Sequence, residues 1–207
     1  MELKRYLLLL ALLCISLPGF AQDSSHNTIS FDLGGSASIA NNTFTNTWNP
    51  SLSPQLGLRL NYHFGSLEAG VRYTSFEGGR SDFADTDKSS FTSFFIYAGW
   101  EYPFEISSHF ILAPGFRFGN SYLTFDHPPT YPPSGSFGEY KFDAHESEFA
   151  YELFMRLQYS PTDGPWSIYS SLSYNRTLTY HTMPLGLISV GISRSFATPT
   201  WLKDFLK

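Results

Sequence analysis

The residues with the clearest potential for chemistry are Asp143, His145 and Ser147, which alternate in the stretch KFDAHESEF. Their side chains would share one face of a β-strand, because successive strand residues point to opposite sides. An acid, a histidine and a serine can hydrolyse esters, since histidine takes the serine proton and the acid orients the histidine. Same-face neighbours on a strand are about 6.5 Å apart, which is long for a triad within one strand. We therefore favour a polar external hairpin and keep ester hydrolysis as the alternative.

Residues 1–21 have the features of an export signal. Lys4 and Arg5 precede a short apolar run, and Gly19 and Ala21 are the small residues that a signal peptidase requires. The run is too short to span a bilayer comfortably, because a membrane helix takes roughly 20 apolar residues. We expect cleavage after Ala21.

Cleavage would leave 186 residues with 17 acidic and 11 basic side chains, and it would remove Cys14, the only cysteine. The resulting net charge of −6 argues against a nucleic-acid partner. His63 and His181 are isolated, so we expect no metal site and no cofactor. The chain is 18% aromatic but only 15% charged, whereas ordinary domains have roughly 25% charged residues. A surface this apolar without a second long apolar run indicates alternating strands.

Apolar residues alternate with small or polar ones through eight segments of about 10 residues each. These segments are 29–39, 55–64, 67–74, 94–102, 110–119, 148–159, 166–175 and 187–196. Long connections alternate with short ones, the long ones at 41–53, 77–90 and 126–145 and the short ones at 65–66, 103–108 and 161–165. Outer-membrane barrels have this order, with short periplasmic turns and long external loops. We predict an all-β fold, an eight-stranded antiparallel up-and-down transmembrane β-barrel with both termini in the periplasm.

The last segment, LISVGISRSF, has apolar Val190, Ile192 and Phe196 on one face and the small residues Ser189, Gly191, Ser193 and Ser195 on the other. It resembles the C-terminal recognition strand of outer-membrane β-barrels, whose terminal aromatic residue is read by the barrel assembly machinery. In this chain, 11 residues follow Phe196. Over residues 28–196, strand count and loop order resemble the small eight-stranded outer-membrane barrels of the OmpA-barrel and OmpX-like group. The resemblance implies an outer-membrane protein of a Gram-negative bacterium, in contact with lipid and lipopolysaccharide.

The opposite face of the segments carries most of the charge, on Asp32, Arg59, Glu68, Arg72, Glu101, Arg117, Glu148, Glu152 and Arg156. Eight strands leave an interior just wide enough for side chains, so these charges must pair. Their depth along neighbouring strands predicts two pairs, Asp32 with Arg59 and Arg117 with Glu152. One alternative is an ion path through the lumen. Another is a soluble barrel resembling a lipocalin, whose aromatic face would point inward.

We divide the chain into a signal peptide at 1–21, a barrel domain at 22–196 and a short periplasmic tail at 197–207. Thr198 and Pro199 suit the start of a helix in the tail, and Trp201 and Leu202 would share its apolar face. The tail is then a short helix at the membrane surface, a handle for a periplasmic partner, or a frayed end.

We expect a non-enzymatic, structural or adhesive role through the external loops, with an external or periplasmic protein as a possible partner. One alternative is an ester hydrolase that modifies lipid A. The spacing of His145 and Ser147 looks like the His-x-Ser dyad of the outer-membrane lipid A deacylase barrels, although Glu148 stands where that family has Asn. The other alternative is a barrel component of a secretion or assembly complex, which the tail would contact.

Overall fold

The computed structural model describes residues 28–40, 42–62, 65–78, 90–127, 144–161, 164–179 and 182–205. Its elements in chain order are β1 (Thr28–Ser38), α2 (Thr43–Thr47), β2 (Trp48–Pro50), β3 (Ser53–Tyr62), β4 (Gly65–Gly78), β5 (Phe91–Glu101), β6 (Phe104–Ser107), β7 (Phe110–Phe125), β8 (His145–Tyr159), β9 (Trp166–Thr177), β10 (Met183–Ala197) and α3 (Thr200–Phe205). The described helices, of five and six residues, are both too short to cross a bilayer.

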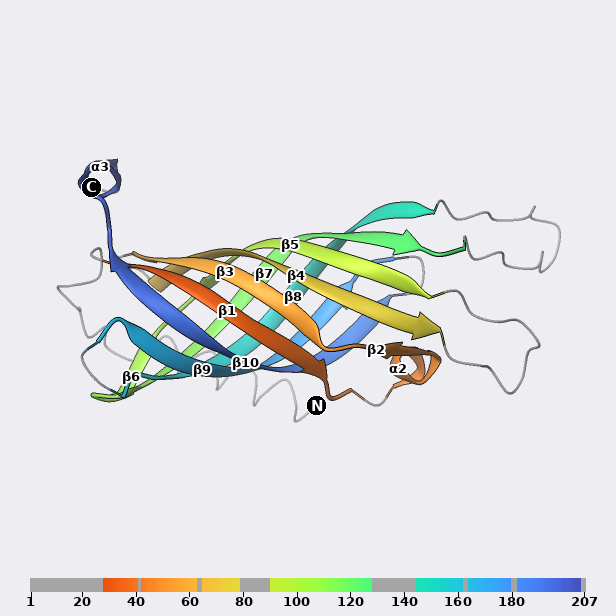
Figure 1. Cartoon of the computed structure of the whole chain (residues 1–207), viewed down its shortest axis with the longest axis horizontal. Coiled ribbons are helices and arrows are strands. Elements are labelled where there is room, and N and C mark those ends of the chain that lie inside the picture. The colour runs from red at the N-terminus through yellow and green to blue at the C-terminus, as the bar shows by residue number, and fades with distance from the viewer. Residues whose placement is uncertain are drawn as a thin grey trace, which may run out of the picture.

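Eight strands form a closed antiparallel barrel (Figure 1). Around it the order is β4, β3, β1, β10, β9, β8, β7 and β5, and β5 pairs with β4 to complete the circle. The first strand pairs with the last along the whole length of β1, from Thr28 opposite Ala197 to Ser38 opposite Leu187. Each of these eight strands is paired on both sides, which is what a lipid environment requires of strands. The predicted eight-stranded up-and-down barrel is confirmed.

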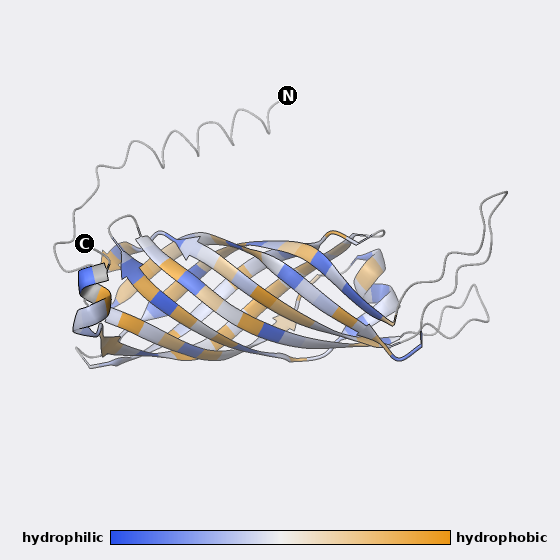
Figure 2. Ribbon diagram, turned by 90° about the horizontal axis from the view of Figure 1, so that it is seen from above, coloured by the Kyte–Doolittle hydropathy of each residue, from blue (hydrophilic) through white to orange (hydrophobic). Residues whose placement is uncertain are grey.

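The two ends of the barrel differ. We call the end with the long connections at 39–52, 79–90 and 126–144 the loop end. The opposite end, which we call the turn end, has the short connections at 63–64, 108–109 and 160–165, and α3 lies beside it (Figure 2). The strands β4, β7 and β8 extend further toward the loop end than predicted. In these extensions polar residues such as Thr124 and His145 take the outward positions, so the apolar alternation ends before the strand does.

Three short elements were not predicted, because they are too short to show a period. Asn42 caps α2: its Oδ1 accepts from the backbone N of Thr45 at 3.0 Å, and its own backbone N donates to Thr45 Oγ1 at 3.0 Å. The strand β2 then pairs with the end of β4, with Trp48 opposite Gly78. At the turn end, β6 pairs with the start of β7.

The alternation of the sequence becomes two faces of the wall, as the alternating colours along each strand in Figure 2 show. Leu33 and Val190 are about half exposed on the outside, whereas Asp32 and Ser189 are buried inside. An apolar exterior is the arrangement of a barrel in lipid and the reverse of the one expected for a soluble barrel. The inward positions are mostly small, polar or charged, with buried apolar residues such as Phe91 and Leu123 among them.

The tail continues from β10 into α3. Leu202 donates from its backbone N to the carbonyl of Pro199 at 3.1 Å, which closes the first turn. Trp201 is 70% exposed and Leu202 is half-buried. The role of the tail stays a prediction.

Candidate functional site

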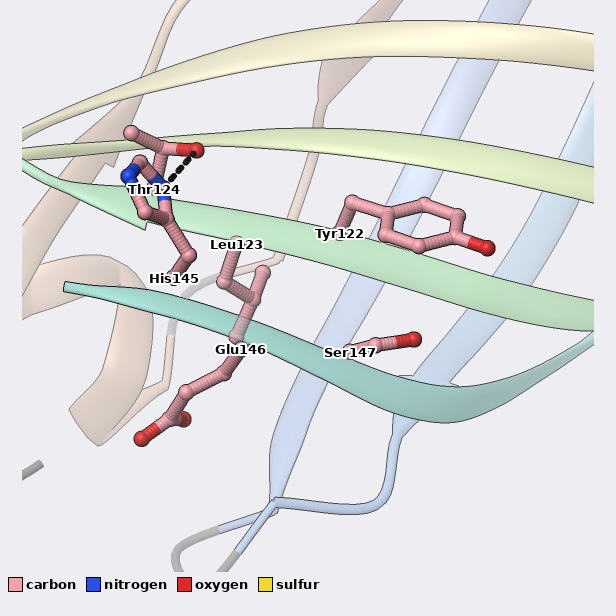
Figure 3. Close-up of a pocket in the computed structure, with 6 residues that line it drawn as sticks. All are labelled: Tyr122, Leu123, Thr124, His145, Glu146 and Ser147. Atoms are coloured by element: carbon pink, nitrogen blue, oxygen red, sulfur yellow. Dashed lines mark hydrogen bonds between the residues drawn. The ribbon is translucent and has the colours of Figure 1, made fainter. Parts of the chain in front are cut away.

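His145 and Ser147 lie on the outer wall at the loop end, near the start of β8 (Figure 3). Both side chains are exposed, and the neighbouring strand β7 supplies their partners. Thr124 Oγ1 is 3.2 Å from His145 Nδ1, and Asn120 Nδ2 donates to Ser147 Oγ at 3.4 Å. Among the described residues, His145 and Ser147 form no hydrogen bond with each other. Each side chain is thus linked across to β7.

A shallow hollow at this place is lined by Tyr122, Leu123, Thr124, His145, Glu146 and Ser147. Glu146 and Glu148 take the inward positions of β8 and are half-buried, and Figure 3 shows the Glu146 carboxylate pointing away from the His145 ring and from Ser147. Asp143 lies outside the described residues. A serine needs an adjacent base to become a nucleophile, and the described side chains do not supply that contact. The hydrolase hypothesis stays a prediction.

The lumen holds a second candidate site, a network of eight charged side chains between the middle of the barrel and the turn end. We call it the charge network; its members are Asp32, Glu68, Glu101, Glu152, Arg59, Arg72, Arg117 and Arg156. All eight are between 0% and 7% exposed. Four acids face four arginines, so the network is neutral as a whole, which is what burial of charge requires.

The structure brings Asp32 and Arg59 together in a two-bonded contact. Arg59 Nε donates to Asp32 Oδ2 at 2.8 Å, and Arg59 Nη2 donates to Oδ1 at 3.1 Å. Arg117 likewise donates from Nε and Nη2 to the two carboxylate oxygens of Glu68, at 2.9 and 2.8 Å. Its remaining nitrogen, Nη1, donates to Glu152 Oε1 at 2.6 Å. Contacts of this paired geometry are among the strongest hydrogen bonds in proteins.

Arg156 joins the Asp32–Arg59 pair to the Glu68–Arg117 pair. Its Nη1 donates to Asp32 at 2.6 Å and its Nη2 to Glu68 at 2.9 Å. These acids lie on β1 and β4, across the lumen from β8. Depth along neighbouring strands, the criterion used on the sequence, does not reveal a contact that crosses the barrel. Glu148, expected in the same lumen, lies nearer the loop end.

Aromatic rings fill the space around the arginines. The guanidinium carbon of Arg117 lies 4.8 Å from the ring centre of Tyr97 and 4.2 Å from that of Phe154, and Arg156 lies 4.8 Å from the ring of Tyr169. Such stacking adds attraction between the cation and the ring face. The network is therefore embedded in packed side chains.

Between the charge network and the loop end, the lumen is filled by apolar side chains instead of charged ones. A cluster of apolar residues, which we call the apolar cap, closes the loop end and contains Phe76, Phe91, Leu123, Met183, Leu185 and Leu187, with Phe44, Trp48 and Phe125 packed against it. The rings of Phe76 and Phe91 stack at 4.5 Å, and Phe44 of α2 lies against both. Sequence reasoning missed the cap because Phe44 and Trp48 fall in a segment predicted as a loop, and most of the other residues lie beyond the ends of the predicted strands. Side chains thus occupy the lumen that an ion path would need.

The three residues interpreted as an assembly signal share the outer face of β10. Val190, Ile192 and Phe196 are all exposed to the outside of the barrel. Phe196 lies opposite Ile29 of β1, at the turn end of the seam where the first and last strands meet. Within the described part of the chain, no group of three potential ligand side chains is placed to hold a metal ion.

The chain is similar in sequence and fold to known proteins. The family model described as outer membrane protein beta-barrel domain matches residues 7–196. Among solved structures, the chain is similar to Neisserial surface protein A (NspA), with 15% identity over 83% of this chain and 98% of that chain and a TM-score of 0.52. The outer membrane protein Ail of Yersinia pestis gives 16% identity over 82% of this chain and 99% of that chain, with a TM-score of 0.48. No curated protein sequence matches the chain.

Proposed function

Because the chain belongs to the outer membrane protein beta-barrel family, we propose that it is a closed outer-membrane barrel with a structural or adhesive role, exerted by the segments at its loop end. The single observation that carries this proposal is the filled lumen. Four buried arginines pair with four buried acids, and the apolar cap lies above them. A barrel packed in this way is a poor conduit, so its exposed segments become the main place for contacts with partners.

The loop end is also built as a platform. The α2 segment is fixed to the start of β10, because Asn42 Nδ2 donates to the carbonyl of Pro184 at 3.1 Å. Phe44 and Trp48 anchor the same segment in the apolar cap. A fixed first connection gives the other segments of this end a constant support, as binding loops on a rigid scaffold require.

We propose that the loop end faces the cell exterior and that the turn end, with both termini, faces the periplasm. The alternation of long and short connections supports this orientation. Single cysteines test it, at exposed Asn46 in α2 and at exposed Ser108 in the turn between β6 and β7. On intact cells, a membrane-impermeant maleimide should label N46C and leave S108C unlabelled until the outer membrane is permeabilised. Labelling of S108C on intact cells would reverse the orientation.

Adhesion is tested by exchanging loops. We expect cells that display the chain to adhere to surfaces coated with extracellular matrix proteins. A variant whose residues 80–88 and 129–142 are replaced by Gly-Ser linkers of equal length should lose most of that adhesion. The matched control replaces residues 161–164 at the turn end, and it should adhere like the unchanged chain.

Gel mobility with and without boiling verifies that each variant forms a barrel in comparable amount. Equal adhesion by the loop variant would contradict the adhesive role. In that case the structural role would be tested by the loss of envelope integrity in a deletion strain.

A further inference from the structure

Six arginines lie on the described barrel strands, and their surroundings divide them into two groups. Four belong to the charge network and contact carboxylates. The other two, Arg176 on β9 and Arg194 on β10, take outward positions. In the part of the chain that the structure describes, neither of them forms an ion pair with a carboxylate. Arg176 lies toward the loop end and Arg194 toward the turn end.

Arg194 is held between two aromatic rings on the outer surface. Its guanidinium carbon lies 5.1 Å from the ring centre of Trp166 and 4.9 Å from that of Phe196. Trp166 lies directly opposite Arg194 in the register of β9 and β10, and Phe196 follows two residues later on the same face. All three side chains are exposed. Two strands therefore fix the position of one cation on the outside of the barrel.

From the aromatic residues around it, we place this position where the membrane changes from acyl chains to headgroups. Other aromatic residues, the paired rings of Phe110 and Tyr159 and of Trp100 and Tyr102, occur at the same end. Girdles of this kind mark the two interfaces of a membrane barrel. A guanidinium at this depth is costly without a partner, because it has left bulk water and faces apolar groups.

The chemistry of a suitable partner for Arg194 follows from the guanidinium group itself. A planar guanidinium donates several parallel N–H bonds and fits a phosphate or a carboxylate. Rings stacked near it restrict its plane and leave its N–H edge available. At the headgroup layer, the abundant anion is the phosphate of the lipid itself.

We propose that Arg194, Trp166 and Phe196 form a binding site for the phosphate of a phospholipid in the leaflet at the turn end. The choice of a phospholipid over lipopolysaccharide rests on the proposed orientation, which places this end at the periplasmic leaflet. The phosphate oxygens accept hydrogen bonds from the Arg194 guanidinium, and the rings of Trp166 and Phe196 lie against the glycerol and the upper acyl chains.

The test measures lipids bound to the folded chain in detergent by native mass spectrometry. The probes are phosphatidylglycerol and a diacylglycerol with the same acyl chains, which lacks the phosphate. Arg194→Gln should weaken phosphatidylglycerol binding about tenfold, the effect of losing a charge-assisted hydrogen bond. The matched control Arg176→Gln, an outward arginine at the other end, should bind like the unchanged chain. Diacylglycerol should bind equally weakly to all three proteins.

Several results would overturn the proposal. Equal affinity of R194Q and the unchanged chain for phosphatidylglycerol would remove the role of Arg194. Displacement of the lipid by an equal concentration of inorganic phosphate would show that the site takes a free anion. Tighter binding of lipopolysaccharide than of phosphatidylglycerol, lost in R194Q, would assign the site to the other leaflet.

A second variant covers a failure of R194Q to fold, which gel mobility would reveal. Trp166→Leu keeps the cation and removes one ring, and it should weaken phosphatidylglycerol binding several-fold, since stacking contributes less than the phosphate bond. Unchanged binding by W166L would contradict the site. Labelling of S108C on intact cells would overturn the orientation independently of any lipid affinity.

Discussion

The charge network and the apolar cap fill the same lumen by opposite means. In the network, Arg59, Arg117 and Arg156 each donate to acids on two other strands, and Arg156 contacts acids on β1 and β4. In the cap, rings and aliphatic chains of β4, β5, β7 and β10 pack under α2. Both regions use inward positions of β4, β5 and β7. An inward position in the alternation therefore predicts that a residue is enclosed in the lumen. It does not predict whether charge pairs or apolar packing stabilise the region around that residue.

The difference teaches where the barrel is sensitive. A buried charge depends on particular partners, and loss of one partner leaves the other uncompensated. An apolar contact depends on volume, so its loss grows with the size of the cavity. The network should thus respond to removal of single charges and recover when the opposite charge is removed too, whereas the cap should respond gradually to size.

The largest effect is expected from Glu152→Leu. Glu152 is fully buried and accepts from Arg72 Nη1 and from Arg117 Nη1, both at 2.6 Å. Its loss leaves Arg72 without a carboxylate among the described residues, while Arg117 keeps Glu68. We expect the free energy of unfolding to fall by about 3–5 kcal/mol, as when a buried ion pair loses one member. Urea unfolding in lipid vesicles, followed by gel mobility, measures the change.

The double variant Glu152→Leu with Arg72→Leu separates charge from packing. It leaves three acids and three arginines in the network, so neutrality is restored. We expect it to be more stable than E152L alone, because replacing a whole buried pair by apolar groups is often nearly neutral. If the double variant were less stable than E152L, the cost would lie in lost volume or bonding geometry, and the contrast with the cap would fail.

The cap should show the graded behaviour. Leu123 is 1% exposed within it. Leu123→Ala should lower the free energy of unfolding by about 2–5 kcal/mol, as large-to-small changes in cores do. Leu123→Val removes one methylene and should cost about 0.8 kcal/mol before any cavity is counted. Equal losses for the two variants in the same urea assay would mean that the cap does not respond to volume.

The barrel itself could be predicted from the sequence, because period-two alternation and loop order reflect the geometry of strands in lipid directly. The apolar face of β10, from Ile188 to Ile192, can be recognised from its own sequence without knowing which strands pair with it. Even the pairing of Asp32 with Arg59 could be predicted, since counting residues from the short turns gives the approximate depth of each residue along adjacent strands.

The rest depended on contacts that no local pattern reports. The reach of Arg156 across the lumen to Glu68 follows from the barrel's closure and strand stagger, which set the neighbours of every inward residue. The cap was missed because Phe44 and Trp48 lie in a short helix and strand within a predicted loop. The sequence spacing of His145 and Ser147 looks like that of a catalytic dyad, but the register with β7 gives each of them a different partner.

A smaller effect is expected where the network region is packed around glycine. Gly34 lies opposite Gly191 at the seam of β1 and β10, and a methyl group on Gly34 would meet the hydroxyl of Tyr169 and lie 2.6 Å from the Val190 carbonyl. Gly34→Ala should therefore destabilise the barrel by about 1–3 kcal/mol, the usual cost of overpacking. Gly35 is the matched control, since its nearest neighbour would be 3.7 Å away, on Leu52.

Thermal gel-shift midpoints of G34A and G35A give the comparison directly. We expect G35A to melt with the unchanged chain and G34A to melt lower. The Tyr169 ring also stacks on Arg156, so a shift of this ring would disturb the network. If G34A and G35A melted at the same temperature, the seam would have space for the added methyl group. That result would contradict the tight packing inferred for the network region.

The smallest effect is expected on the outer wall, at the height of the cap but outside it. Ser147→Ala removes a hydroxyl whose contact is the exposed Asn120 amide, and stability should stay within about 0.5 kcal/mol, as for most surface changes. The same variant tests the hydrolase hypothesis through the acyl chain pattern of lipid A, read by mass spectrometry. Because the described side chains offer Ser147 no base, we expect cells with S147A and cells with the unchanged chain to have the same lipid A. A lipid A that loses acyl chains only with the unchanged chain would instead make Ser147 a nucleophile, with His145 brought to it by a rearrangement of the loop end.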